Sequence, residues 1–163
     1  MIKVGDVVMH RYNGLCKISG QKKLSFKGPL TNYYVLVPVY DGASTIYVPK
    51  DKAKELLRRP LSKDEIIKLI SDMPNLKSVW IDDMKRRKDA YTQIVLKGDP
   101  YELVAMIHSI REKAIEKNAI GKRISEADQR SLQIAEKVVH GEIAYALDMN
   151  PAEVPGLIRK QYE

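Results

Sequence analysis

The chain has 163 residues, 44% apolar and 30% charged, which suits one or two compact domains and argues against a disordered chain. No apolar stretch approaches the roughly 20 residues that cross a bilayer, and a single cysteine, Cys16, excludes an intrachain disulfide. The N-terminus lacks the apolar core of a signal peptide, so we expect a soluble cytoplasmic protein.

The net charge of +7 is distributed unevenly along the chain. Residues 1–60 hold 11 Lys and Arg against 4 Asp and Glu, which is a net +7, whereas residues 61–163 hold 17 of each sign and are neutral. A basic surface in the first third indicates a polyanionic or acidic partner, and charge alone does not separate nucleic acid from an acidic protein face. A purely solubilising role is the alternative.

Residues 3–49 show the pattern of antiparallel β-strands. Short runs rich in Val, Ile and Tyr alternate with turn residues such as Asn13-Gly14, Gly28-Pro29 and Asp41-Gly42. Four or five strands are predicted, at about residues 3–9, 14–24, 32–39 and 44–49. Strands this short pack best as a small SH3-like or Tudor-like β-barrel, which we assign to a first domain of residues 1–58.

The apolar spacing becomes helical after Pro60. We therefore predict an all-helical second domain over residues 62–163, reached through a linker around Leu57 to Leu61. The predicted fold class is α+β, in which the small β-domain precedes four main helices and a short tail helix.

Capping signals mark the ends of these helices. The predicted helices cover about residues 62–73, 78–97, 99 onward, 125–148 and 150 onward. Ser62 with Glu65 forms a capping box, Asp99 and Ser125 are N-caps, and Gly98 suits a left-handed C-cap.

No residue pattern in the sequence indicates catalysis. His10, His108 and His140 are scattered, and Cys16 has no second cysteine at metal-ligand spacing. There is no phosphate-binding loop, dinucleotide fingerprint or nucleophile elbow. We therefore expect neither an enzyme nor a bound metal or cofactor, and no small-molecule substrate.

The segment 80–88 carries the most suggestive functional pattern. Four consecutive cations follow two large apolar side chains that a helix would place one turn apart. These residues are Trp80, Met84, Lys85, Arg86, Arg87 and Lys88. Cations neutralise DNA phosphates, and an apolar side chain can wedge between base steps from the minor groove. The alternative is that the apolar pair is core and the cations form a solvated face.

Two strand segments present a basic and aromatic edge that suits binding of a partner protein by strand addition. The candidate residues are Lys22, Lys23, Leu24, Ile46, Tyr47, Val48 and Pro49. The alternative is a plain barrel whose lysines protect its edge from aggregation.

The order and spacing of several short motifs resemble the CarD/CdnL family of transcription regulators. The N-terminal motifs are Lys3-Val4-Gly5-Asp6-Val7-Val8, Asn13-Gly14, Tyr33-Tyr34-Val35-Leu36 and Ile46-Tyr47-Val48-Pro49. The resemblance continues through Arg86-Arg87, Gly98-Asp99, Ile124-Ser125, Glu136 and Glu142-Ile143-Ala144. The first part is also similar to the polymerase-interacting module of the transcription-repair coupling factor.

The resemblance implies a Tudor-like domain that holds the β subunit of bacterial RNA polymerase and a helical domain that contacts promoter DNA. The DNA contact would lie at the upstream edge of the transcription bubble, through the minor groove and phosphates, without catalysis. Counting back from Gly98 puts the family's wedge residue, a Trp, at Met84, whereas the one Trp is Trp80. Two basic positions of the polymerase-binding edge fall on Leu24 and Tyr47.

The sequence thus predicts a regulator that binds polymerase through residues near 22–24 and 44–49 and DNA through residues 80–88, and that changes open-complex stability. One alternative is a polymerase-tethered adaptor whose helical domain binds another protein, which the neutral charge of residues 61–163 favours. Another is an RNA-binding module that uses the basic barrel.

Overall fold

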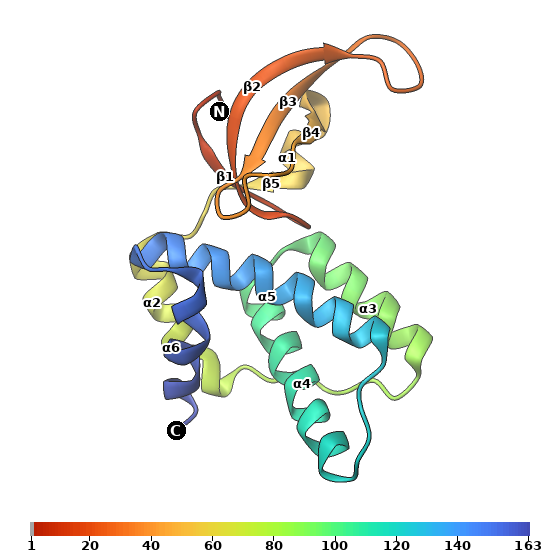
Figure 1. Ribbon diagram of the computed structural model, residues 1–163, viewed down its shortest axis with the longest axis vertical. Coiled ribbons are helices and arrows are strands. Elements are labelled where there is room, and N and C mark those ends of the chain that lie inside the picture. The colour runs from red at the N-terminus through yellow and green to blue at the C-terminus, as the bar shows by residue number, and fades with distance from the viewer. Residues whose placement is uncertain (1) are drawn as a thin grey trace. The chain divides into compact units, whose positions relative to one another are not determined.

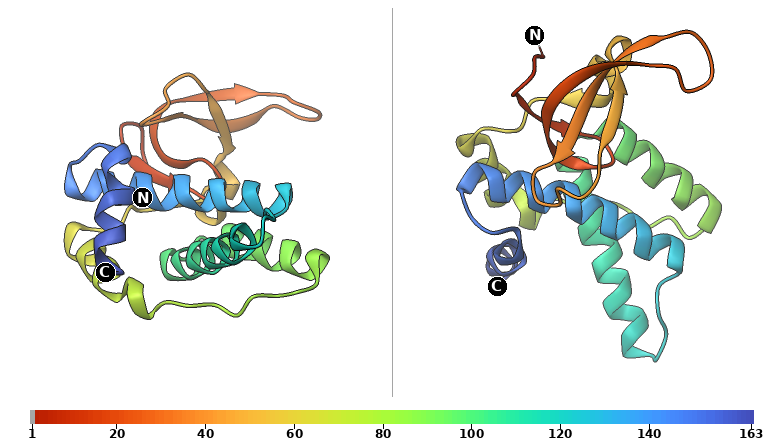
Figure 2. Two further views of the ribbon diagram at one scale, coloured as in Figure 1. Left: turned by 60° about the horizontal axis from the view of Figure 1, so that its bottom comes forward. Right: turned by 45° about the horizontal axis from the view of Figure 1, so that its top comes forward.

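The computed structural model describes residues 2–163, which fall into two units (Figures 1 and 2). The first unit, Met1–Pro60, is built on a β-sheet, and the second, Leu61–Glu163, consists of helices and their connections. The α+β class predicted from the change of periodicity is confirmed.

One antiparallel sheet organises the first unit. Its strands are β1 (Val7–His10), β2 (Gly14–Leu24), β3 (Thr31–Pro38), β4 (Ile46–Pro49) and β5 (Leu57–Arg58), in the order β4-β3-β2-β1-β5. The first strand begins at Val7 rather than near Lys3. A turn precedes it, in which Lys3 N donates to the Asp6 carboxylate at 3.0 Å and Gly5 has a φ of 97°.

Strand β5 corrects the predicted linker around Leu57. Leu57 and Arg58 pair with His10 and Met9 of β1, and the Leu57 side chain is only 4% exposed. The sequence prediction missed β5 because two residues carry no alternation and their pairing partner lies far away in sequence. A short helix, α1 (Ala53–Leu56), leads into β5 and was not predicted either.

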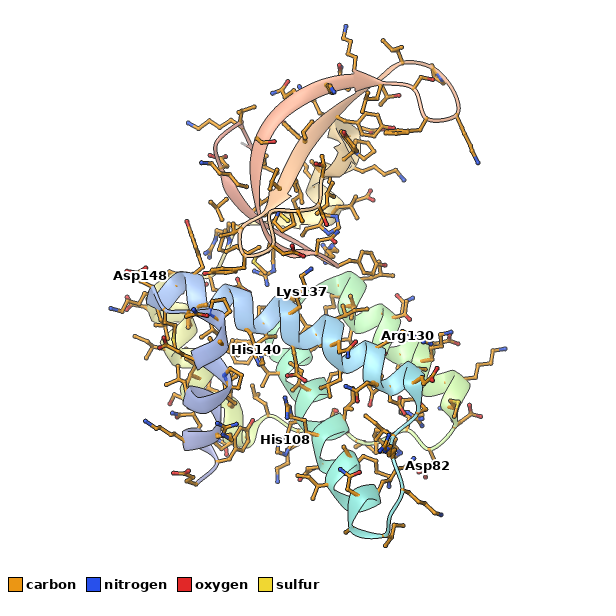
Figure 3. The ribbon with its side chains drawn as sticks, in the orientation of Figure 1. Asp82, His108, Arg130, Lys137, His140 and Asp148 are labelled. Carbon is orange, nitrogen blue, oxygen red and sulfur yellow. The ribbon has the colours of Figure 1, made fainter. Side chains whose placement is uncertain are left out.

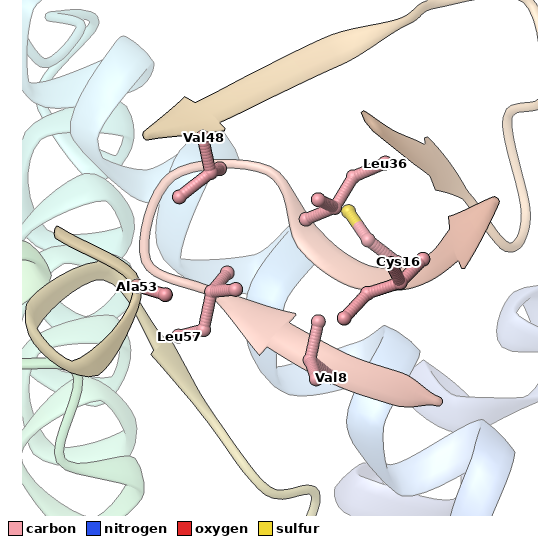
Figure 4. Packing of buried hydrophobic residues seen from close by; sticks show 7 residues of the cluster. Val8, Cys16, Leu36, Val48, Ala53 and Leu57 are labelled. Carbon is pink, nitrogen blue, oxygen red and sulfur yellow. The ribbon is translucent and has the colours of Figure 1, made fainter. Parts of the chain in front are cut away.

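An apolar cluster packs in this unit (Figure 4). Its buried members are Val8, Cys16, Ile18, Leu36, Val48, Ala53 and Leu57. Every strand and α1 contribute, so the sheet curls around the cluster. The end strands β4 and β5 do not pair with each other among the described residues, and the predicted closed barrel is therefore not confirmed.

The second unit holds the remaining helices. They are α2 (Lys63–Asp72), α3 (Met84–Lys97), α4 (Pro100–Ala119), α5 (Glu126–Leu147) and α6 (Val154–Gln161), with short 3-10 turns at Met73–Asn75 and Pro151–Glu153. Three starts follow the predicted caps. The capping box of Ser62 and Glu65 is complete, and Asp99 and Ser125 accept backbone hydrogen bonds at 2.9 and 3.1 Å. Gly98 ends α3 with a φ of 72°.

Helix α3 starts later than predicted. It begins at Met84 rather than near Ser78, because the Asp83 carboxylate accepts a hydrogen bond from Arg86 N at 3.1 Å and caps it there. The segment before the cap, which includes Trp80, is not helical. The prediction that Trp80 and Met84 lie one helical turn apart is therefore wrong.

Helix α5 is the centre of the second unit, in contact with α2, α3, α4 and α6 (Figure 2). The predicted apolar stripe from Leu132 to Ile143 is buried, while Ala146 is half-buried. The buried Glu142 carboxylate of α5 accepts a hydrogen bond from Leu61 N at 2.7 Å and so fixes the start of the unit to its central helix.

Candidate interaction surfaces

One face of the sheet collects several of the predicted polymerase-binding residues. In the strand register Lys22 of β2 lies beside Tyr33 of β3, which lies beside Pro49 of β4, and Val35 lies beside Tyr47. Side chains alternate between the two faces along a strand, and paired residues share a face. Lys22, Tyr33, Tyr47 and Pro49 therefore form one surface on three strands.

Phe26, in the β2–β3 loop, completes an aromatic cluster on this surface. Its ring lies 5.3 Å from Tyr33 in an edge-on arrangement and 5.8 Å from Tyr47. Phe26 is 59% exposed and Tyr47 is 39% exposed, so the cluster presents apolar area to solvent. Sequence reasoning missed Phe26 because the loop folds back over the sheet. We call Phe26, Tyr33 and Tyr47 the aromatic cluster.

The remaining predicted residues of this edge divide between surface and core. Lys23 is exposed, whereas Leu24, on the same face as Lys22, is half-buried. Val48 is 0% exposed in the core, and Ile46 packs against that core. Val48 and Ile46 thus position β4 beneath the surface that its neighbour Tyr47 presents.

A buried ion pair organises the predicted DNA-binding segment. The Arg87 guanidinium of α3 donates from Nε and Nη2 to the two carboxylate oxygens of Asp128 on α5, at 2.9 and 2.8 Å. Both side chains are 4% exposed. These hydrogen bonds hold the pKa of Arg87 above its ordinary value despite its burial. The pair joins α3 to α5 inside the unit.

Arg87 also fixes the extended segment that precedes α3. Its Nη1 donates to the backbone carbonyls of Ile81 at 2.8 Å and Asp82 at 3.2 Å. The guanidinium carbon lies 4.3 Å from the centroid of the Trp80 ring, and Lys113 Nζ of α4 lies 5.6 Å from it. Trp80 is half-buried with both cations close to its ring, and these contacts stabilise the ring where it lies.

The side chains next to the contact of Arg87 with Trp80 point to solvent. Met84 at the first position of α3 is 57% exposed, and Val79, beside Trp80, is 90% exposed. Lys85, Arg86 and Lys88 are exposed as well. The predicted residues therefore separate into a buried anchor, Arg87, a half-buried Trp80, and a solvent-facing set made of Met84, Lys85, Arg86 and Lys88.

The N-terminal unit matches a known family over almost its whole length. Residues 2–61 match the family described as the CarD-like/TRCF RID domain. The N-terminal unit is a CarD-like domain. A comparison of the chain with curated proteins found no match. The aromatic cluster and Lys22 beside it thus lie on a domain whose family interacts with RNA polymerase.

No candidate metal site is formed by residues 2–163. Neither the CarD-like domain nor the helical unit brings three His, Cys, Asp or Glu side chains together as metal ligands. Among the same residues, no helix combines the length and apolar character that crossing a membrane requires.

Proposed function

We propose that this protein regulates bacterial transcription initiation by binding, not by catalysis, and that it does so in the cytoplasm. The CarD-like domain, as a Tudor-like module, holds the β subunit of RNA polymerase. The helical unit contacts promoter DNA at the upstream edge of the bubble and changes the stability of the open complex. The observation that carries the proposal is the family match over residues 2–61, with an exposed aromatic cluster on the same domain.

The aromatic cluster and its lysines are the proposed polymerase-binding surface. Rigid aromatic side chains supply most of the energy of many protein interfaces, and they lose little conformational freedom on binding. Lys22, on the same face as the cluster, adds positive charge that attracts an acidic partner surface, and Lys23 adds charge from the opposite face of β2. Strand β4 is an end strand of the sheet, so its outer edge is suited to pairing with a strand of the partner.

The proposed DNA contact combines Met84 with Lys85, Arg86 and Lys88. The exposure of Met84 favours it over Trp80 as the apolar group that enters the minor groove. Trp80, which contacts Arg87 and lies near Lys113, is better suited to anchoring the segment that leads into α3. A preference for the open complex of about 1.4 kcal/mol shifts its ratio to the closed complex tenfold, so a few such contacts suffice.

The test is the lifetime of the open complex formed by purified bacterial RNA polymerase on a promoter. The wild-type chain is expected to prolong it. Met84→Ala should abolish most of this effect while polymerase binding persists, because it removes only the apolar contact. Ile67→Ala, which truncates a 50% exposed side chain on α2, is the matched control and should behave as wild type.

The proposed binding to polymerase is tested separately by pull-down. Phe26→Ala and Tyr47→Ala should each weaken retention of the chain on polymerase, whereas Lys137→Gln, an exposed position on α5, should not. A wild-type chain that binds polymerase but leaves the lifetime unchanged would refute the DNA contact and favour the adaptor that binds another protein. Binding of single-stranded RNA without polymerase, with steep salt dependence, would favour the RNA-binding module instead.

A further inference from the structure

The Asp128 carboxylate of α5 belongs to a buried chain of hydrogen bonds that leads to the proposed DNA contact. Arg87 donates to both of its oxygens, and Ser125 Oγ, at the start of the same helix, donates to Oδ2 at 2.9 Å. Asp128 and Arg87 are both buried, so neither side chain is placed to contact a phosphate. Their hydrogen bonds act inside the helical unit.

The other end of this chain of hydrogen bonds is the segment before α3. Arg87 Nη1 donates to the carbonyls of Ile81 and Asp82, and Asp82 is labelled in Figure 3. Residues 76–82 form neither helix nor strand, so their position depends on contacts with other elements. Ser78 Oγ donates to Ala105 O of α4 at 3.2 Å, and Arg87 holds the part of the segment nearest to α3. One guanidinium thus joins this part of the segment to the first turn of α5.

The ion pair supplies something that apolar packing between α3 and α5 would not. Apolar residues of similar volume often replace a buried ion pair without loss of stability. They offer no donor to a carbonyl, however, and a lysine lacks the planar set of donors that a guanidinium directs at several acceptors at once. Arg87, oriented by Asp128, therefore fixes the position of residues 81 and 82 in addition to joining the helices.

We propose that Asp128 and Ser125 are positioning residues for the DNA contact, although neither touches DNA. They orient Arg87, which fixes the segment directly before α3 and thereby the place of Met84 at its first position. Met84 then binds without the loss of freedom that ordering a mobile segment would add to the cost of binding. The inference rests on the proposed function, because it concerns the same contact with DNA.

The test uses the double variant Arg87→Met with Asp128→Leu in the full chain. It removes both charges together, so no buried charge is left unpaired and the helical unit should stay folded. It also removes the donors to the carbonyls of Ile81 and Asp82. We expect the gain in open-complex lifetime to fall about fivefold or more, because ordering even one freed residue lowers a binding constant by about that factor. Retention on polymerase should not change.

A second pair of variants decides the question if the double variant does not fold. Ser125→Ala and Ser62→Ala each remove a side-chain N-cap, so we expect similar, small losses of stability. Of these two serines, Ser125 also donates to the Asp128 carboxylate. Ser125→Ala should therefore lower the gain in lifetime about twofold or more, whereas Ser62→Ala should leave it unchanged.

The position of the segment is measured without DNA by ¹⁵N relaxation. Residues 80–82 should have backbone order parameters of about 0.85 in the wild-type chain and below about 0.6 in the double variant. This measurement needs neither polymerase nor a promoter, so it reports the effect of Arg87 on the segment independently of the effect on transcription.

Three results would overturn the inference while the proposed function stands. The first is a folded double variant that prolongs the open complex as the wild-type chain does. The second is an equal loss for Ser125→Ala and Ser62→Ala, which would reduce the effect to stability. The third is an unchanged order parameter at residues 80–82 in the double variant. A wild-type chain that leaves the lifetime unchanged would instead overturn the proposed function, and this inference with it.

Discussion

Arg87 differs from its neighbours in the basic run Lys85–Lys88, because its guanidinium is buried and paired with the Asp128 carboxylate. Its guanidinium bridges α3, α5 and the segment before α3, while the three other cations face solvent. A buried bidentate pair is recognised only when the folded chain brings Asp128 beside it. Four consecutive cations look alike in sequence, so sequence reasoning placed Arg87 with the DNA-binding set.

Removing one partner of this pair should be strongly destabilising. Arg87→Gln leaves the Asp128 carboxylate buried without its counter-ion, and we expect the free energy of unfolding of the helical unit to fall by about 3–5 kcal/mol. The measurement is denaturant unfolding followed by the fluorescence of Trp80, the one Trp of the chain.

Two variants serve as controls for this loss. Arg86→Gln, at an exposed position of the same helix, should change stability by less than about 0.5 kcal/mol. The double variant Arg87→Met with Asp128→Leu should recover much of the loss, because neither charge is left unpaired. An Arg87→Gln variant as stable as Arg86→Gln would contradict the structural role of the pair.

His10 links the stability of the CarD-like domain to pH. Its Nδ1 accepts hydrogen bonds from the backbone N–H groups of Tyr12 and Asn13, both at 3.2 Å, which requires that nitrogen to be unprotonated. Burial, and then the charge of Arg11, lower the pKa of His10 below its ordinary value of 6.5. The unfolded chain therefore takes up the proton first as the pH falls.

We expect this domain to keep its full stability above pH 6.5 and to lose stability as the pH falls below that value, through the lowered pKa of His10. Amide exchange of the domain at a series of pH values measures this, and the ring ¹⁵N shifts report the pKa of His10. His10→Gln should flatten the pH dependence. An ordinary or raised pKa of His10 in the folded chain would refute the argument.

At the scale of elements, the position of the first turn of α3 matters most, because it carries Met84 and the exposed cations. Asp83→Ala removes the N-cap, and we expect a loss of about 1 kcal/mol together with faster amide exchange in that turn. Asp82→Ala is the matched control, since Arg87 contacts Asp82 through its backbone carbonyl. Equal effects of the two substitutions would show that the cap does not define the start of α3.

Elements with local signals could be predicted from the sequence, and those that depend on distant partners could not. The caps at Ser62, Asp99 and Ser125 act within one helical turn, so their residues alone indicate the helix starts. Trp80 and Met84 are four residues apart, a spacing typical of one face of a helix. Trp80 nevertheless lies in the non-helical segment before α3, which Arg87 of α3 holds in place.

The same distinction applies to the candidate surfaces. Tyr47 was found from the strand pattern, but Phe26 joins it only because the β2–β3 loop folds over the sheet. A cavity of the helical unit, lined in part by His108, is assembled by α4, α5 and α6, and no sequence motif indicates it. A surface that several elements assemble can therefore be recognised only when the fold is known, even where each element is predicted.

At the scale of the whole molecule, each of the two units buries apolar side chains of its own, so we expect them to lose stability separately. Leu36→Ala truncates a side chain that is 0% exposed in the core of the CarD-like domain, and it should destabilise that domain by about 2–5 kcal/mol. Amide exchange, measured residue by residue, should accelerate in the sheet only.

The reciprocal variant is Ile143→Ala, which truncates a 0% exposed side chain of α5. It should accelerate exchange in the helical unit and leave the sheet protected. If either substitution accelerates amide exchange equally in both units, the chain unfolds as one cooperative body, and the prediction that the units lose stability separately is wrong.

The burial of Arg87 also affects how salt acts on the proposed complex with DNA. A cation that is held by Asp128 releases no counter-ion from a phosphate, so the run from Lys85 to Lys88 displaces ions at three positions and not four. Each decade of added salt then lowers the contribution of this run to the binding constant by about 2.7 decades at most, where four contacts would give about 3.6. As ionic strength rises, the start of α3 should therefore lose less affinity for DNA than four solvent-exposed cations would lose.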